Sequence, residues 1–128
     1  MSLFFSTPSR LLRSLAAPAV LLAAGLCGTA ASAADAASAA DEAAQMALGK
    51  QLFITGATPA CAICHTLKDA ESEGAIGPVF DDLQPDAARV SKALHDGLGA
   101  MPSFKDSLTE AQIAALALYV SRASRGLK

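Results

Sequence analysis

The hydrophobic positions near the C-terminus of the chain follow the period of an α-helix. Four apolar residues fall at i, i+3, i+4 and i+7 and therefore share one helical face: Ile113, Leu116, Ala117 and Val120. Thr109 precedes them and can form a capping box with Gln112, or Ser107 can do so with Glu110 in an alternative register. The pattern predicts an amphipathic helix that begins near Thr109.

Two earlier segments also carry helix signals. Residues 41–56 have acidic residues in the first turn and good helix formers after them, and Met46, Gly49 and Phe53 fall on one face. Residues 85–97 begin with proline and end with glycine, the usual asymmetry of a helix. The sequence contains neither an alternating strand pattern nor an internal repeat. We therefore expect an all-α domain.

The first 33 residues have the features of a secretory signal peptide. Arg10 and Arg13 form a positive region, an apolar stretch follows, and the small residues up to Ala33 fit the A-x-A cleavage rule. The apolar stretch is short and contains Pro18, which disfavours a transmembrane helix. We expect cleavage near Ala33, export to the periplasm and no stable membrane insertion; an uncleaved anchor is the alternative.

This leader divides the chain into three parts. Residues 1–33 are the cleaved signal peptide, and Cys27 is removed with them. Residues 34–40 are small and featureless, so we expect a flexible N-terminus there. Residues 41–128 form the single folded domain.

Charge and aromatic content restrict the partners and the core. Without the two arginines of the leader, eight Lys and Arg residues face twelve Asp and Glu residues, which argues against nucleic acid or an acidic membrane surface as a partner. The chain has one tyrosine and no tryptophan, so the apolar core of so small a domain is marginal. Such a domain gains stability by packing around a bulky apolar cofactor.

The motif CAICH, residues 61–65, carries the chemistry of the chain. Zinc would need four ligands, and adjacent Cys64 and His65 cannot easily reach one tetrahedral ion. A redox dithiol would need a βαβ pattern around Cys61 and Cys64, which the sequence lacks. C-x-x-C-H is also the attachment pattern of haem c, in which two thiols bind the haem and His65 becomes an axial iron ligand. Export across the membrane favours this third interpretation.

The sixth iron ligand has three candidates. Met101 lies in a glycine-rich loop closed by Pro102, where the backbone can approach a flat ring. Met46 lies on the apolar face of a predicted helix, where core packing explains it. His95 lies late in a predicted helix, where interaction with the helix C-terminus and solvent explains it. Met101 is therefore the favoured ligand.

These residues resemble the class I c-type cytochromes from about Glu42 to Ser124. The matching stretches are CAICH (61–65), GAIGPVF (74–80), GAMPSF (99–104) and LTEAQIAALALYV (108–120). The resemblance implies a compact class I cytochrome c fold, with three to four helices around one covalently bound haem. It also implies that the carbonyl of Pro78 binds the imidazole of His65 and orients it.

The resemblance further implies that the first and last helices of the domain cross tightly. Gly49 and Phe53 match the crossing positions on the first helix, and Leu116 and Tyr119 match those on the last. Because Gly49 has no side chain, the two backbones can approach each other. These four residues are expected to be structural.

A haem with histidine and methionine ligands has no open iron position, so the expected function is electron transfer and not catalysis. The protein is predicted to carry one electron in the periplasm on haem c bound to Cys61 and Cys64, with His65 and Met101 as axial ligands. A dehydrogenase would be the donor, and a respiratory oxidase or cytochrome the acceptor. Residues 58–90 have a looser similarity to the monohaem cytochrome subunits that accept electrons from molybdenum sulfite dehydrogenases, so sulfite dehydrogenase is one candidate donor.

Two other functions stay open at this stage. A five-coordinate haem enzyme or gas-binding protein would need Met101 to leave the iron easily, and no histidine or arginine beside Met101 in the sequence suggests acid–base help. A fixed haem subunit of a dehydrogenase complex would have the same site as a free carrier. In either carrier, the uncharged stretches 54–60 and 98–104 are expected around the exposed haem edge, where partners would dock by apolar contact.

Overall fold

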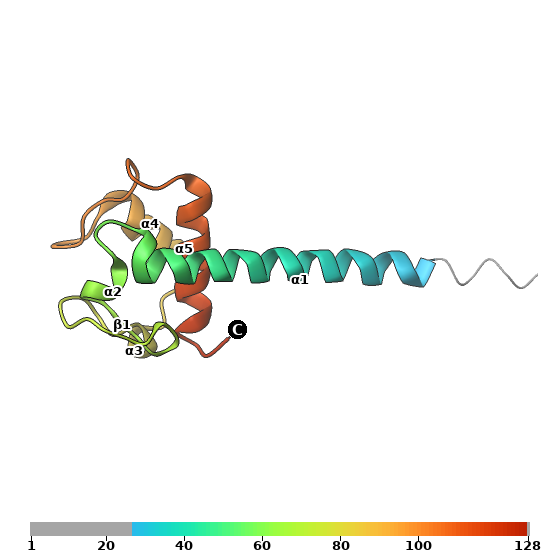
Figure 1. Cartoon of the computed structure of the whole chain (residues 1–128), viewed down its shortest axis with the longest axis horizontal. Helices are drawn as coiled ribbons and strands as arrows, with labels where there is room; N and C mark the ends of the chain where they lie inside the picture. The colour runs from blue at the N-terminus through green and yellow to red at the C-terminus, as the bar shows by residue number, and fades with distance from the viewer. Residues whose placement is uncertain (1–26, 128) are drawn as a thin grey trace, which may run out of the picture.

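The computed structural model describes the backbone of residues 27–127 and the side chains of residues 35–127. Most of the predicted signal peptide lies outside the described residues, so its cleavage and the boundaries derived from it remain predictions. The described part is mainly helical, as the sequence predicted (Figure 1).

Three longer helices frame the structure: α1 (Cys27–Gln51), α4 (Ala87–Asp96) and α5 (Glu110–Ala123). α1 continues directly into a π-helical turn, η1 (Leu52–Gly56). Between η1 and α4 lie two one-turn helices, α2 (Cys61–Cys64) and α3 (Phe80–Leu83), and the 3-10 turn η2 (Lys68–Ala70). The predicted helices over 41–56, 85–97 and from Thr109 thus correspond to the end of α1 with η1, to α4 and to α5.

A small hairpin is an element that the sequence did not predict. Strands β1 (Thr66–Leu67) and β2 (Ser72–Glu73) pair antiparallel on either side of η2. The Leu67 amide donates to the Ser72 hydroxyl at 3.0 Å, and both residues are buried. A strand of two residues is too short to show an alternating pattern, so the sequence carries no signal for it.

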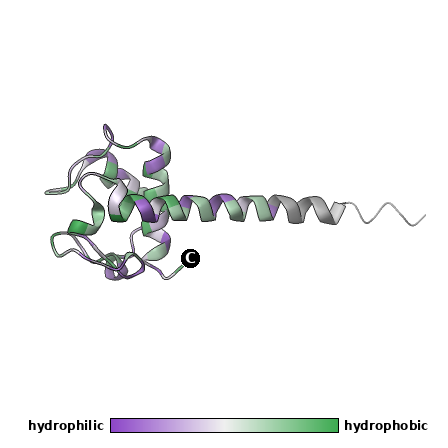
Figure 2. Cartoon of the chain, in the orientation of Figure 1, coloured by the Kyte–Doolittle hydropathy of each residue, from purple (hydrophilic) through white to green (hydrophobic). Residues whose placement is uncertain are grey.

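The first half of α1 projects from the rest of the structure (Figure 1). Residues 35–45 are exposed, and Figure 2 shows hydrophilic and weakly hydrophobic residues mixed along this part. Residues 34–40, which were predicted to be flexible, are helical here. Most of them are alanines, and alanine has the highest helix propensity, which the prediction neglected. Among residues 27–127, no helix combines the length and the apolar content needed to cross a membrane.

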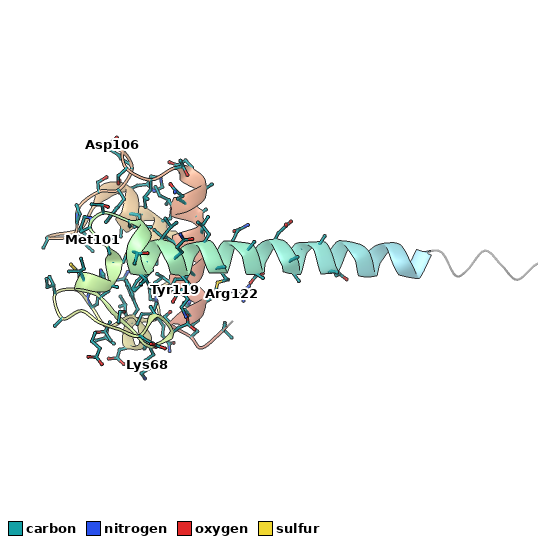
Figure 3. All side chains as sticks on the ribbon, in the orientation of Figure 1. Lys68, Met101, Asp106, Tyr119 and Arg122 are labelled. Atoms are coloured by element: carbon teal, nitrogen blue, oxygen red, sulfur yellow. The ribbon has the colours of Figure 1, made fainter. Side chains whose placement is uncertain are left out.

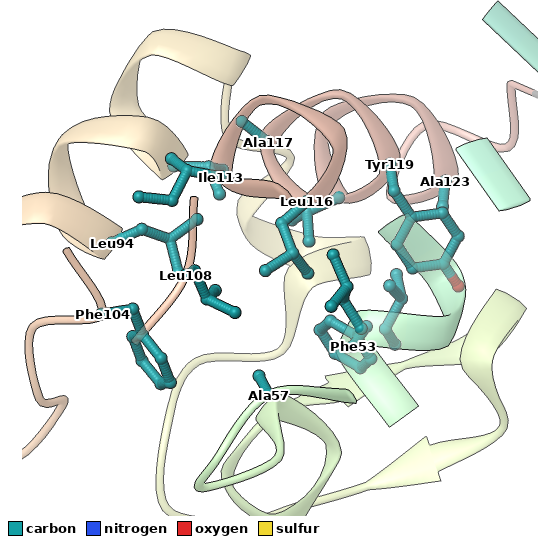
Figure 4. Packing of buried hydrophobic residues seen from close by; sticks show 14 of the residues in the cluster. Phe53, Ala57, Leu94, Phe104, Leu108, Ile113, Leu116, Ala117, Tyr119 and Ala123 are labelled. Carbon is teal, nitrogen blue, oxygen red and sulfur yellow. The ribbon is translucent and has the colours of Figure 1, made fainter. Parts of the chain in front are cut away.

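α1 and α5 cross at Gly49, as the resemblance implied. A Cβ atom on Gly49 would lie 2.5 Å from Cβ of Tyr119 and would also overlap the carbonyl oxygen of Ala115, so only glycine allows this contact. The rings of Phe53 and Tyr119 meet edge to face, 5.9 Å between centroids. Figure 4 shows Phe53 beneath Tyr119 and Leu116 of α5. All three side chains are buried, so the crossing is the centre of the core.

The β1–β2 hairpin is attached to this crossing through Asp69. The hydroxyl of Tyr119 donates to Oδ2 of Asp69 at 2.8 Å, and Nζ of Lys50 lies 3.1 Å from the same oxygen. Burial, followed by the Asp69 carboxylate, raises the pKa of Tyr119 well above its ordinary value, so the hydroxyl keeps its proton. One carboxylate therefore joins α1, η2 and α5.

A second contact joins α4 to the start of α5. Asp86 caps α4, and Thr109 caps α5 in the predicted capping box with Gln112. Between these helices, Nδ1 of His95 lies 2.8 Å from the carbonyl oxygen of Ser91, and Nε2 lies 3.0 Å from Oε2 of Glu110. A carbonyl and a carboxylate both accept hydrogen bonds, so the imidazolium, with two N–H groups, satisfies both. Hydrogen bonding to Ser91, and then to Glu110, raises the pKa of His95 above its ordinary value.

The close approach at Gly49 predicts a reversed effect of alanine there. In an open helix, Gly→Ala stabilises by about 1 kcal/mol. We expect Gly49→Ala in the holoprotein to lower the free energy of unfolding by about 2 kcal/mol instead, because the new methyl group overlaps α5. Urea unfolding followed by circular dichroism measures this. Ala47→Gly, at an exposed position of the same helix, is the control and should cost about 1 kcal/mol. A stabilising Gly49→Ala would contradict the crossing.

The raised pKa of His95 predicts a pH-dependent contribution of Glu110 to stability. A histidine whose pKa is raised on folding stabilises the folded state fully at pH values below its unfolded-state pKa of about 6.5. This stabilisation disappears as the pH rises through its folded-state pKa. Glu110→Gln should therefore lower the unfolding midpoint at about pH 5.5 more than at about pH 9, and should lower the His95 pKa in an NMR titration. Asp106→Asn is the control, since it removes one exposed charge that makes no ion pair among the described residues. If the two variants change the unfolding midpoint equally at both pH values, the contact between His95 and Glu110 is refuted.

Candidate functional site

A cavity of about 260 Å³ opens between α2, α3, α4 and the loop that follows α4. Most of its lining is apolar and comes from residues far apart in the sequence, among them Pro59, Ile76, Val90, Leu98, Pro102 and Phe104. The cysteines of the CAICH motif, His65 and Met101 also line it. The structure thus brings together the four side chains that the sequence analysis selected.

The two cysteines stand at the ends of α2, a single helical turn with strongly hydrophobic residues (Figure 2). Positions i and i+3 of a helix lie on the same side, so Cys61 and Cys64 can both line the cavity. At His65 the backbone leaves the helix for an extended conformation, with φ −112° and ψ 141°. This change of direction lets the imidazole follow the two thiols into the same cavity.

The electrostatics of the thiols distinguish between the interpretations of the motif. Burial raises the pKa of Cys61 to about 11, and the neighbouring Cys64 adds to the increase. A redox dithiol needs the opposite, a lowered pKa that gives a reactive thiolate. Among the side chains that the structure describes, no group of three His, Cys, Asp or Glu residues could hold a metal ion, which disfavours structural zinc.

The imidazole of His65 is buried and has a fixed tautomer. Its Nδ1 lies 3.1 Å from the carbonyl oxygen of Pro78, the contact that the family resemblance implied. Because the carbonyl can only accept, Nδ1–H is the donor in this contact, which leaves Nε2 as the nitrogen that is available to a metal. An imidazole in this state can ligate a metal through Nε2, with Pro78 fixing the ring and increasing its basicity.

The segment that carries Pro78 approaches the motif so closely that it needs glycine. A Cβ atom on Gly77 would lie 2.6 Å from Nδ1 of His65, and one on Gly74 would lie 2.5 Å from the amide nitrogen of His65. The amides of Ile76 and Gly77 donate to the carbonyl of Cys64 at 3.1 and 2.7 Å. Residues 74–78 therefore form a backbone cradle around His65.

Met101 is held at the base of a tight hairpin on the other side of the cavity. Leu98 and Met101 exchange two backbone hydrogen bonds of 3.0 Å. Gly97 and Gly99 have positive φ angles of 74° and 61°, which favour glycine. Figure 3 shows Met101 at the end of the molecule away from the projecting part of α1. The loop thus presents the thioether to the cavity with little backbone freedom.

The other two candidate ligands lie outside the cavity lining. Met46 packs against the hydrophobic core, as predicted. Both ring nitrogens of His95 face acceptors, the carbonyl of Ser91 and the carboxylate of Glu110. Neither contributes to the site that His65 and Met101 share.

Among the lining residues that the sequence analysis did not identify, two have a distinct chemical character. Arg89 of α4 is a cation in an otherwise apolar lining, and Phe80 of α3 stacks on the imidazole of His65. The helical pattern of residues 85–97 places Arg89 in a helix, next to the buried Val90. It does not predict that the Arg89 side chain lines a cavity. Nothing in the sequence indicated the contact between Phe80 and His65.

The residues present fit a covalently bound haem. Two thiols separated by one helical turn, an imidazole held at Nδ1 and a thioether surround one largely apolar cavity. This set of donors matches the attachment and axial ligation of haem c.

Two comparisons with known proteins find matches to cytochromes. Residues 44–120 match the family described as cytochrome C oxidase, cbb3-type, subunit III. The crystal structure of the c-type cytochrome SorU from Sinorhizobium meliloti is similar, with 48% sequence identity and a TM-score of 0.61. The similarity covers 62% of this chain and 91% of the SorU chain. None of the curated protein sequences matches the chain.

The matched region covers more than half of the chain and includes both the CAICH motif and Met101. The chain therefore belongs to the c-type cytochromes, as a monohaem cytochrome of class I that binds one haem c covalently.

Proposed function

We propose that the protein is a periplasmic one-electron carrier in which His65 and Met101 are the axial iron ligands. The observation that supports this most is that both side chains line the same cavity as Cys61 and Cys64 while coming from separate elements. Bound haem c supplies the one-electron couple. The features of the leader, residues 1–33, support export to the periplasm.

Each part of the chain has a distinct task in this proposal. The thiols of Cys61 and Cys64 anchor the cofactor, and the Pro78 carbonyl orients the imidazole of His65. The hairpin between Leu98 and Met101 positions the thioether, which as an iron ligand raises the reduction potential. The apolar lining excludes water from the site, which also affects the potential.

A five-coordinate haem enzyme has less support. Among the described residues that line the cavity, His65 is the one histidine, and aspartate and glutamate do not occur. General acid–base help for peroxide or similar chemistry would have to come from such a group. Arg89 is the one residue among Lys, Arg, Asp and Glu in this lining. It lies on α4 and not on the loop that holds Met101.

Redox partners are proposed to dock at the mouth of the cavity. Three large apolar side chains near it are exposed, Ile63 by 64%, Ile76 by 71% and Leu98 by 72%. Two of the lysines that could steer a partner are already paired, Lys50 with Asp69 and Lys92 with Asp96. Apolar contact with weak electrostatic steering is therefore the proposed mode of recognition.

The donor that we propose is a molybdenum sulfite dehydrogenase. This rests on the similarity of residues 58–90 to the cytochrome subunits that serve such enzymes. The structure places this stretch around His65, and its members Cys61, Ile76 and Phe80 all line the cavity. A donor that selects this stretch would therefore contact the surface closest to the cofactor.

The assignment of Met101 predicts that its removal opens the iron. Met101→Ala should lower the reduction potential and let the ferrous protein bind carbon monoxide at neutral pH, because the thioether no longer occupies the sixth position. The native protein should resist carbon monoxide. Visible spectra with and without the gas, together with a redox titration, measure both effects.

Met46→Ala is the matched control, since this methionine packs against the core and does not line the cavity. It should keep the potential and the resistance to carbon monoxide. If native protein and Met101→Ala bind the gas equally well, Met101 is not the ligand and the five-coordinate alternative gains support.

The proposed donor and docking mode can be tested together. Sulfite added to periplasmic extract of the source organism should reduce the holoprotein, visible as a sharpened α-band. Raising the ionic strength from about 20 mM to about 500 mM should slow this reduction by less than about tenfold, because steering by charge is weak. Stopped-flow spectroscopy gives the rates.

The outcomes of this experiment separate the alternatives. A haem band that ignores sulfite but responds to another respiratory donor rejects the proposed donor and keeps the carrier. A fall in rate by orders of magnitude with salt contradicts docking by apolar contact. Copurification with the dehydrogenase identifies a fixed subunit instead of a shuttle.

A further inference from the structure

The imidazole of His65 is contacted from three directions. The Pro78 carbonyl meets its edge at Nδ1, and the backbone of Gly77 lies so close that an added Cβ atom would be 2.4 Å from Cε1, 2.6 Å from Nδ1 and 2.9 Å from Nε2. The ring of Phe80 covers one face, with 4.3 Å between ring centroids and 12° between ring planes. The first two contacts come from backbone, whereas the third comes from a side chain.

The contact of Phe80 with the face of the imidazole restricts changes in the ring plane that the Pro78 hydrogen bond allows. A single hydrogen bond tolerates a range of angles, so the contact at Nδ1 holds one edge of the ring near its acceptor but leaves the ring plane some freedom to tilt. A parallel ring at 4.3 Å opposes this tilting, because it would drive one edge of the imidazole into Phe80. The orientation of the imidazole plane therefore depends on Phe80.

Phe80 is itself held by the core. It is the first residue of α3 and half-buried, and its ring centroid lies 6.1 Å from that of Phe53. Phe53 is fully buried at the crossing of α1 and α5, where it meets Tyr119. A series of ring contacts thus runs from Tyr119 through Phe53 and Phe80 to His65 and connects the imidazole to the buried centre of the core.

We infer that Phe80 is a positioning residue that sets the orientation of the His65 imidazole plane about its bond to the iron. This rests on the proposed role of His65 as an axial ligand. The orientation of an axial imidazole, together with that of the other axial ligand, affects the in-plane magnetic axes of a low-spin ferric haem and thereby the distribution of unpaired spin over the haem edge. Orientation of a ligand by its neighbours also adjusts the properties of the metal.

The experiment compares three variants of the ferric holoprotein by the proton NMR shifts of the haem methyl groups and by EPR. Phe80→Leu removes the flat face at similar volume and should reorder or broaden the four methyl resonances and change the g anisotropy. Phe80→Tyr keeps the face and should retain the native pattern. Ile113→Ala is the control, because Ile113 is buried in the core but neither lines the cavity nor belongs to the series of ring contacts.

Urea unfolding separates positioning from general loss of structure. Ile113→Ala should cost at least as much stability as Phe80→Leu, because Ile113 is the more deeply buried, and yet keep the native methyl pattern. Native spectra for Phe80→Leu, or the same spectral change in Ile113→Ala, would overturn the inference. If Phe80→Leu gives no holoprotein, Phe80→Met tests the same loss of the flat face with a more flexible side chain.

These outcomes are distinct from failure of the proposed function. If the unmodified protein lacks the spectrum of histidine–methionine ligation, the ligand assignment fails. If it has that spectrum and Phe80→Leu preserves the methyl pattern, only the role of Phe80 is rejected.

Discussion

The contact of α1 with the backbone of α5 at Gly49 is the constraint on which the other parts of the structure depend. Because the helices touch without an intervening side chain, Phe53 and Tyr119 are brought face to edge directly beside the crossing. Tyr119 then reaches Asp69 and so attaches the β1–β2 hairpin, and Phe53 reaches Phe80 and so supports the segment beside His65. A domain with few large apolar residues obtains a defined centre in this way.

The two sides of the cavity are built by different means. On the side of His65, the chain folds back on itself so tightly that Gly74 and Gly77 press their backbones against the motif. On the side of Met101, the chain forms an isolated hairpin held by two backbone hydrogen bonds and by its anchorage between α4 and α5. The histidine side is thus held by close backbone packing, whereas the methionine side is a loop that packs against the core through Met101 and Phe104.

Much of the fold and most of the site could be predicted because they depend on short patterns. The capping box at Thr109, the helical face that contains Leu116 and the spacing of CAICH are each encoded within a few residues, and the structure has the first two as predicted. The approach of Pro78 to His65 spans thirteen positions and was accessible only through the resemblance to a family.

The features that sequence reasoning missed depend on contacts with no local signature. The stacking of Phe80 on His65 and the position of Arg89 in the lining follow from how α3 and α4 pack, which periodicity does not reveal. The helical state of residues 34–40 had a signal in its alanines, but their small size suggested flexibility instead. The two-residue strands were too short for any pattern.

The projecting part of α1 has a consequence for how that helix opens. The ion pair between Glu42 and Arg122, 2.8 Å long, joins α1 to α5 near the start of their contact, and residues 35–41 before it are exposed. Helical backbone there is stabilised by little besides propensity, whereas from Gly49 onward it shares the burial of the core. Opening of the exposed N-terminal part of α1 therefore costs little free energy, whereas the part from Gly49 onward opens only when the whole domain unfolds. α1 is a single helix in shape but two segments in cooperativity, with the division close to Glu42.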